Sequence, residues 1–173
     1  LRLDATGSIG STSEIVVTNS AMLLNDSATP ISKKVTLSGG TVKGTGIFNT
    51  SLLIDTGDVV FPGDSPGTFT VADMTGGGGG TYDWQLLDAT GGAGTGWGQI
   101  NVTNALVIAA SSSNKFHIVI QTLDSITPID HQGPPLHFNP ESAVDSSWLI
   151  ATSALPITGF DPAAFTFDAS NFV

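Results

Sequence analysis

The segment DTGDVVFPGDSPGTFTVADMTGGGGGTYDWQLLD, residues 55–88, decides the fold class of this chain. A short apolar run at 59–61 is followed by an alternating run at 68–71, and a second alternating run begins at Tyr82. Alternation with a period of two predicts β-strands. Five glycines at 76–80 and the turn between the first two runs predict tight corners. That turn consists of Pro62, Gly63, Asp64, Ser65, Pro66 and Gly67.

The composition is that of an acidic β-protein. Fifteen acidic and five basic residues give the 173-residue chain a formal net charge of −10. This charge argues against binding to nucleic acid or to anionic membranes, because both depend on Lys and Arg. No stretch is apolar for long enough to span a bilayer, so we expect no membrane insertion by this segment. The absence of cysteine excludes disulfides and thiol chemistry.

A nearly regular repeat predicts the architecture. The apolar centres of six alternating runs follow each other at almost equal intervals: Leu37, Ile54, Val71, Leu86, Val102 and Ile118. A near-constant interval with strand character is typical of a solenoid, in which each coil lies on the previous one. We therefore expect a single-domain, all-β parallel solenoid with these six residues stacked in one internal column. A sandwich of short strands is the alternative, because it gives similar spacing.

The chain divides into two parts on this interpretation. Residues 1–123 would form the coils of the solenoid. Residues 124–173 would form a loop excursion followed by C-terminal strands that pack on the same solenoid or cap it. Several prolines and many polar residues predict that 124–147 is a side loop and not a strand.

Five segments carry a resemblance to a known family: SGGTVKGTGIF (38–48), FPGDSPGTFTV (61–71), GGGTYDWQLLDATGGAGTGWGQINVTNALVI (78–108), SSSNKFHIVIQTL (111–123) and SSWLIATSALPITGFDPAAFTFDASNF (146–172). Together they resemble the C-terminal part of bacterial surface proteins with autotransporter-associated β-strand repeats, of the type found in Verrucomicrobia and Planctomycetes. The resemblance implies a right-handed parallel β-helix, export, and a cell-surface or fibre role. It brings no catalytic residues with it. Members of that family usually continue past the position of Val173 with further strands and an anchor.

One turn matches a hydrolase pattern in letters only. Residues 63–67 read Gly-Asp-Ser-Pro-Gly, which fits the G-x-S-x-G signature of a nucleophilic serine. In that mechanism the residue after the serine donates its backbone N–H to the oxyanion, and here that residue is Pro66, which has no N–H. We therefore interpret the segment as a structural turn and expect no catalytic role for Ser65. No catalytic residue is predicted anywhere in the chain.

Two groups of side chains suggest metal binding. Asp55, Asp58 and Asp64 cluster around glycines, and carboxylate oxygens are the ligands that calcium prefers. Aspartates at corners more often bind their own backbone, and no calcium-binding motif is present, so no cofactor is expected and calcium is the alternative. The second group is His131 and His137 with Asp130 and Glu141 in the side loop, which gives a zinc hypothesis beside the simpler interpretation of solvated histidines.

Tryptophan placement bears on ligand binding. Trp97 lies between glycines and is the candidate for stacking on a sugar, whereas Trp84 alternates with Tyr82 and Leu86 and is expected in the core. The sequence therefore predicts a non-enzymatic extracellular structural or adhesive module of a bacterial cell-surface protein. The alternatives are a carbohydrate-binding adhesin, with a surface polysaccharide as partner, and a polysaccharide-active β-helix enzyme.

The two ends of the predicted solenoid favour self-association. Solenoid ends expose unpaired backbone groups, which soluble proteins usually cover with polar caps. Here the N-terminal region carries the apolar run 15–17, and the chain finishes with Phe165, Phe167, Phe172 and Val173. We therefore expect the chain to bind itself head to tail as a homo-oligomer, growing end to end into a filament.

Overall fold

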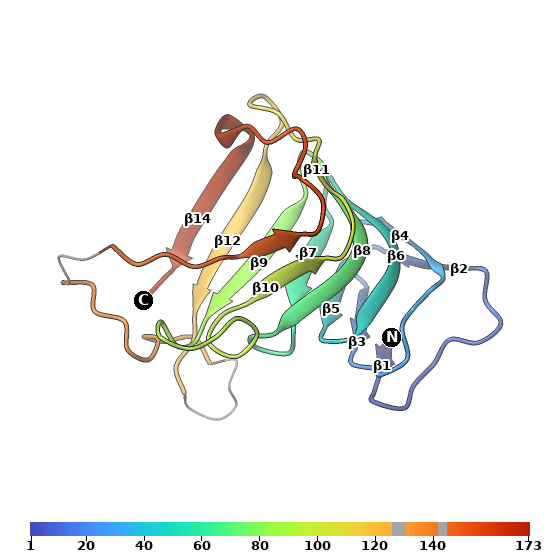
Figure 1. Ribbon diagram of the computed structural model, residues 1–173, viewed down its shortest axis with the longest axis horizontal. Coiled ribbons are helices and arrows are strands. Elements are labelled where there is room, and N and C mark those ends of the chain that lie inside the picture. Colours follow the sequence, from blue (N-terminus) through green and yellow to red (C-terminus); the bar gives the residue numbers. More distant parts are fainter. Residues whose placement is uncertain (126–130, 142–144) are drawn as a thin grey trace.

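Parallel β-sheets make up the architecture of this protein. The computed structural model describes residues 1–125, 131–141 and 145–173 (Figure 1). Within these ranges the chain forms β-strands and one short 3₁₀-helix, η1 (Pro162–Ala164), and no helix is long and apolar enough to cross a membrane. Every pairing between two of the described strands is parallel. The all-β prediction is confirmed, and the sandwich alternative is wrong because such sandwiches pair their strands antiparallel.

A seven-stranded sheet forms one wall of the molecule. Its strands follow the order β1-β3-β5-β7-β9-β12-β14, so sequence order is kept along the wall. They are β1 (Arg2–Leu3), β3 (Met22–Asn25), β5 (Thr41–Gly44), β7 (Val59–Pro62), β9 (Thr81–Leu86), β12 (Phe116–Thr122) and β14 (Phe165–Asn171). The strands lie beside one another in one direction across Figure 1, from blue to red.

Two smaller sheets form the opposite wall. The two-stranded sheet contains β2 (Glu14–Thr18) and β4 (Lys34–Ser38). The five-stranded sheet is built around β8 (Thr68–Gly76), which pairs with β6 (Ile47–Ile54), β10 (Gln99–Val102) and β11 (Leu106–Ile108). The last strand on this wall is β13 (Ala151–Ser153), which pairs with β10.

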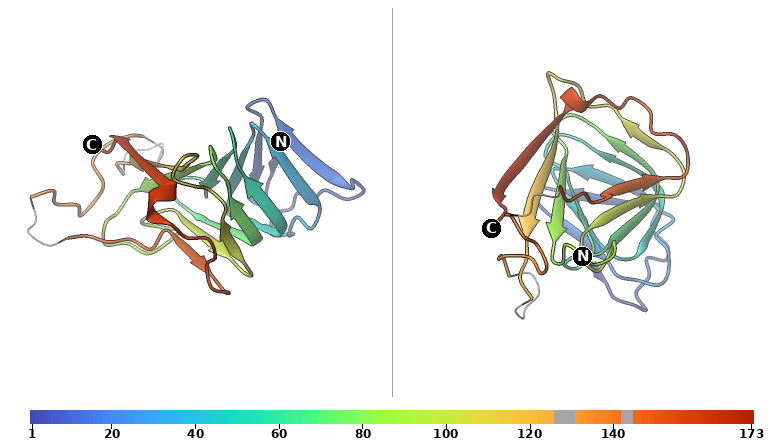
Figure 2. Two further views of the ribbon diagram at one scale, coloured as in Figure 1. Left: turned by 90° about the horizontal axis from the view of Figure 1, so that it is seen from above. Right: turned by 60° about the vertical axis from the view of Figure 1, so that its left-hand side comes forward.

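The chain alternates between the two walls as it advances. From β1 to β10 each strand is followed by one on the other wall, and the termini lie near opposite ends of the stack (Figure 2). We call one passage of the chain over both walls a circuit. The register partners on one wall show how many residues each circuit contains. Thr41 pairs with Val59 and Val59 with Thr81, whereas Thr81 pairs with His117, which lies much farther along the chain. Circuits therefore lengthen toward the C-terminus, where the loops become larger.

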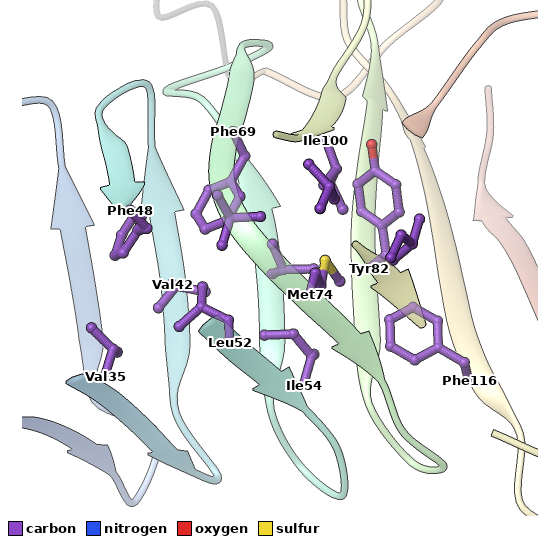
Figure 3. Packing of buried hydrophobic residues seen from close by; sticks show 14 of the residues in the cluster. Val35, Val42, Phe48, Leu52, Ile54, Phe69, Met74, Tyr82, Ile100 and Phe116 are labelled. Atoms are coloured by element: carbon purple, nitrogen blue, oxygen red, sulfur yellow. The ribbon is translucent and has the colours of Figure 1, made fainter. Parts of the chain in front are cut away.

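The core fills the space between the walls. Side chains that point inward from both walls meet there, as Val42, Phe48, Phe69 and Ile100 do in Figure 3. The rings of Phe48 and Phe69 stack with centroids 4.9 Å apart. Burying such side chains is the main stabilising term of the fold, at about 1.5–3 kcal/mol for each large apolar residue.

The prediction of a single internal column is wrong. Its six residues divide between the walls: Ile54, Val71 and Val102 belong to the five-stranded sheet, Leu86 and Ile118 to the seven-stranded sheet, and Leu37 to the two-stranded sheet. Only Val71 and Val102 are paired in register. All except the half-buried Leu37 are buried, so the residues were correctly assigned to the core. The repeat interval in the sequence is shorter than the separation of register partners such as Phe48 and Val71, so the repeated residues do not stack in one column.

Tight corners let the chain pass from wall to wall. Gly44 ends β5 with a φ of +116°, and a Cβ at this position would overlap the backbone carbonyl of Asn25 in the preceding circuit. Glycine is required there because it alone tolerates both the angle and the close approach.

The predicted side loop falls partly outside the described residues, which exclude 126–130 and 142–144. In the described part, Leu136 receives a backbone bond from Ala89 and donates one to Leu87. This part of the loop therefore lies against the chain that follows β9.

Candidate functional site at the C-terminal end

The C-terminal end of the molecule has two edge strands. β14 pairs with β12 on one side and β13 pairs with β10, and within the described ranges no strand covers their other sides. An uncovered edge presents backbone N–H and C=O groups that are ready to pair with a further strand. We call this end, bounded by β13, β14 and the chain at 154–165, the tail.

A cavity of about 290 Å³ opens between the walls at the tail. Its lining comes from both walls and includes Met74, Ile100 and Phe116, which Figure 3 shows pointing into the interior. Among the described residues that line it, Tyr82 alone has a polar side chain, and its hydroxyl lies 3.0 Å from the carbonyl oxygen of Ile150 and 3.3 Å from that of Gly98. Burial raises the pKa of Tyr82 well above its ordinary value. The cavity is therefore uncharged and suits apolar groups.

Aromatic residues form the rim of the cavity. Phe160 and Phe167 are 62% and 64% exposed, although the alternation of β14 points Phe167 toward the interior, beside Ile118. The 3₁₀-helix η1 holds this region in place, because the Asp161 carboxylate accepts the backbone N–H of Ala163 at 2.9 Å. Exposed aromatic rings around an apolar opening are typical of a surface that binds another apolar surface.

Asp83 is the most perturbed carboxylate among the described residues, and it lies on the outer face of β9. Burial raises its pKa to about 6, and the positive charge of Lys43 opposes this rise. Gln121 donates its side-chain N–H to Oδ2 of Asp83 at 2.9 Å, whereas the buried Oδ1 has no partner among the described residues. Lys43 itself lies 4.4 Å from the ring centre of Phe61 and 3.5 Å from Asp64. Glycoside hydrolysis uses a pair of carboxyl groups, whereas the described partners of Asp83 are Gln121 and Lys43.

The turn at 62–67 places Ser65 in a tight and enclosed position. Its φ is +112°, its side chain is buried, and its Oγ forms no hydrogen bond with any described residue. A nucleophilic serine needs a base within hydrogen-bond distance. The described residues provide none at this hydroxyl.

Of the three calcium candidates, Asp55 and Asp58 lie beside each other, whereas Asp64 lies apart from them. Asp55 and Asp58 precede β7, and Asp64 follows it and pairs with Lys43. Asp58 is buried, and its carboxylate accepts the backbone N–H groups of Gly39 at 2.8 Å, Gly40 at 3.3 Å and Asp55 at 3.2 Å. The carboxylate oxygens of Asp58 therefore hydrogen-bond to the backbone of the corner in the preceding circuit. Within the described ranges no group of three acids or histidines is suited to a metal ion.

The loop histidines contact different acids. Nδ1 of His131 lies 3.0 Å from Asp124, and Nδ1 of His137 lies 2.8 Å from Asp88, whose pKa is lowered first by this hydrogen bond. Asp130, the third member of the zinc hypothesis, falls outside the described residues. The structure thus places the two histidines in separate pairs.

Both tryptophans named in the sequence contact backbone carbonyls. Trp84 is buried, and its indole N–H donates to Gly98 at 2.8 Å, which confirms its predicted place in the core. Trp97 is half-buried against the core, and its indole N–H donates to Leu149 at 3.2 Å. Part of the ring that would stack on a sugar is therefore covered.

Comparison with protein-family models, curated proteins and solved structures finds no match to this chain. The open tail is therefore the candidate site on geometry alone. It combines an apolar cavity, exposed aromatic residues and two uncovered strand edges.

We predict that Asp58 stabilises the fold and binds no calcium. Asp58→Ala leaves three backbone N–H groups without their acceptor, so the free energy of unfolding should fall by about 2–4 kcal/mol. Asp64→Ala, which removes one exposed ion pair, should cost less than about 1 kcal/mol. Chemical denaturation measures both. A rise in melting temperature on adding calcium, lost in Asp58→Ala, would contradict this assignment.

The raised pKa of Asp83 should give the protein's stability an unusual pH dependence. Because its folded-state pKa of about 6 lies above the ordinary value of 3.8, the folded protein binds more protons between these pH values. Stability therefore falls as the pH rises through this window. Asp83→Asn should stabilise the protein by about 1–2 kcal/mol at pH 8, allowing for screening by solvent, and the gain should vanish below pH 4. Asp145→Asn, at an exposed position, controls for the loss of one negative charge; an equal gain there would refute the prediction.

Proposed function

We propose that this protein is a non-enzymatic structural or adhesive module of a bacterial cell-surface protein, built as a right-handed parallel β-helix. The observation that carries the proposal is the open tail, at which both walls end in uncovered strands around an unfilled apolar interior. A module of this kind bears further β-structure on its end, because each added coil pairs with the strands before it.

The alternation between walls supports the β-helix part of the proposal. Every strand pair is parallel, and successive strands of the seven-stranded sheet are separated in sequence by strands of the other wall. A β-helix has this connectivity, since its chain winds around a common interior.

Duplicating one circuit tests the β-helix directly. A second copy of residues 41–58, inserted before Val59, adds one strand to each wall, because Thr41 and Val59 are register partners. The variant should unfold cooperatively and be longer by about 5 Å, the spacing between neighbouring strands. Circular dichroism and small-angle scattering measure the two properties. An insertion of the same segment in scrambled order is the control, and equal tolerance of both insertions would argue against a β-helix.

Surface labelling tests the cellular part of the proposal. Antibodies raised against the purified protein should bind intact cells of the source bacterium, because the module would stand outside the envelope. The comparison is with permeabilised cells, which should show no large increase in signal. Labelling that appears only after permeabilisation would overturn the cell-surface assignment.

A further inference from the structure

The two ends of the molecule differ in charge. Residues 116–173 contain six acidic residues and neither Lys nor Arg: Asp124, Asp130, Glu141, Asp145, Asp161 and Asp168. Residues 1–43 contain four basic and three acidic residues: Arg2, Lys33, Lys34, Lys43, Asp4, Glu14 and Asp26. The formal charge is therefore −6 over the first set and +1 over the second. The described part of residues 116–173 lies at the same end of the stack as the tail (Figure 2).

The opposite end, which we call the head, is bounded by β1 and β2 and by the loop between them. β1 pairs only with β3 and β2 only with β4, so both have a free side within the described ranges. Ile9 of the loop packs against the core and covers part of this end. A recess of about 100 Å³ remains, lined in part by Leu3 and Lys33. Lys33 forms no ion pair with a described residue.

We propose that the tail of one molecule binds the head of a second copy of this chain. This inference rests on the proposed structural role and names the partner. β14 and β1 are the two ends of the same sheet, and β13 and β2 end the opposite wall (Figure 1). Since all strands are parallel, a second copy in the same orientation presents its edges in the same direction. Both walls then continue across the junction.

Charge and apolar burial favour the head-to-tail contact over the two symmetric contacts, tail to tail and head to head. A tail-to-tail contact would bring together two C-terminal regions whose described residues (116–125, 131–141 and 145–173) each carry a formal −5, and like charges across an interface disfavour binding strongly. A head-to-head contact would leave the apolar cavity and the exposed Phe160 and Phe167 uncovered. The head-to-tail contact covers these rings and faces the acidic tail with the less acidic end. Such a contact is heterologous, and it builds a filament unless its rotation closes a ring.

A charge placed on the rim tests the contact. Phe167→Lys puts a cation into the apolar surface that the head would cover, so self-association should weaken by at least about tenfold in sedimentation velocity. Thr166→Lys is the matched control, because Thr166 is the preceding residue of β14 and points to the outer face, where association should be unchanged. Phe160→Lys provides a second rim variant if Phe167→Lys alters the melting temperature.

Mixing distinguishes the three arrangements. Fluorescently labelled Phe167→Lys protein has an intact head, so it should sediment together with an excess of unlabelled wild type. Because its altered tail binds no further molecule, it should shorten the wild-type assemblies. If wild type associates and the labelled variant stays monomeric in the mixture, the contact is tail to tail and the inference is wrong. If the variant alone associates as strongly as wild type, the contact is head to head and the inference is again wrong.

A charge reversal at the head gives an independent test. Lys33→Glu should weaken association by at least about tenfold at low salt, and Lys33→Gln, which removes the charge without reversing it, should weaken association less. Wild type that remains monomeric at millimolar concentration would overturn the inference. That result would leave the proposed function standing, because circuit duplication and surface labelling test it without any self-association.

Discussion

Parallel pairing between one circuit and the next is the constraint on which the rest of this structure depends. Strands about 4.8 Å apart bring the inward side chains of successive circuits into van der Waals contact, so backbone pairing and core packing arise together. Val71 and Val102 illustrate this, because they are register partners and both are buried. Each inner strand is therefore stabilised by pairing and packing with two neighbours. Within the described residues, a strand at either end has one such neighbour.

Local patterns in the sequence were enough to predict strands, corners and the all-β class. They were not enough to assign strands to walls. Both walls bury every second residue, so an alternating run such as that of β9 looks the same whichever wall it joins. The number of residues in a circuit decides on which wall a given strand lies. This number is small between the register partners Thr41 and Val59 and much larger between Thr81 and His117. This variation comes from loops whose length has no counterpart in the strand pattern.

The roles of single polar residues depended on partners that are distant in sequence. Asp58 was a calcium candidate because of its neighbours, yet its carboxylate binds Gly39 and Gly40 in the preceding circuit. Trp97 looked exposed between glycines, but its indole meets Leu149, far along the chain. The apolar tail was different, since Phe165 and Phe167 signalled it in the sequence. The cavity behind them follows from the meeting of the two walls, which no local pattern records.

The asymmetry between the ends gives the stack a direction. At the head, Ile9 of the loop between β1 and β2 packs against the core, and the recess that remains there is about 100 Å³. At the tail, Phe160 and Phe167 stay exposed around an empty interior, and the free energy of burying them is still available. A β-strand added at the tail would gain apolar burial against these rings together with backbone pairing to β13 and β14.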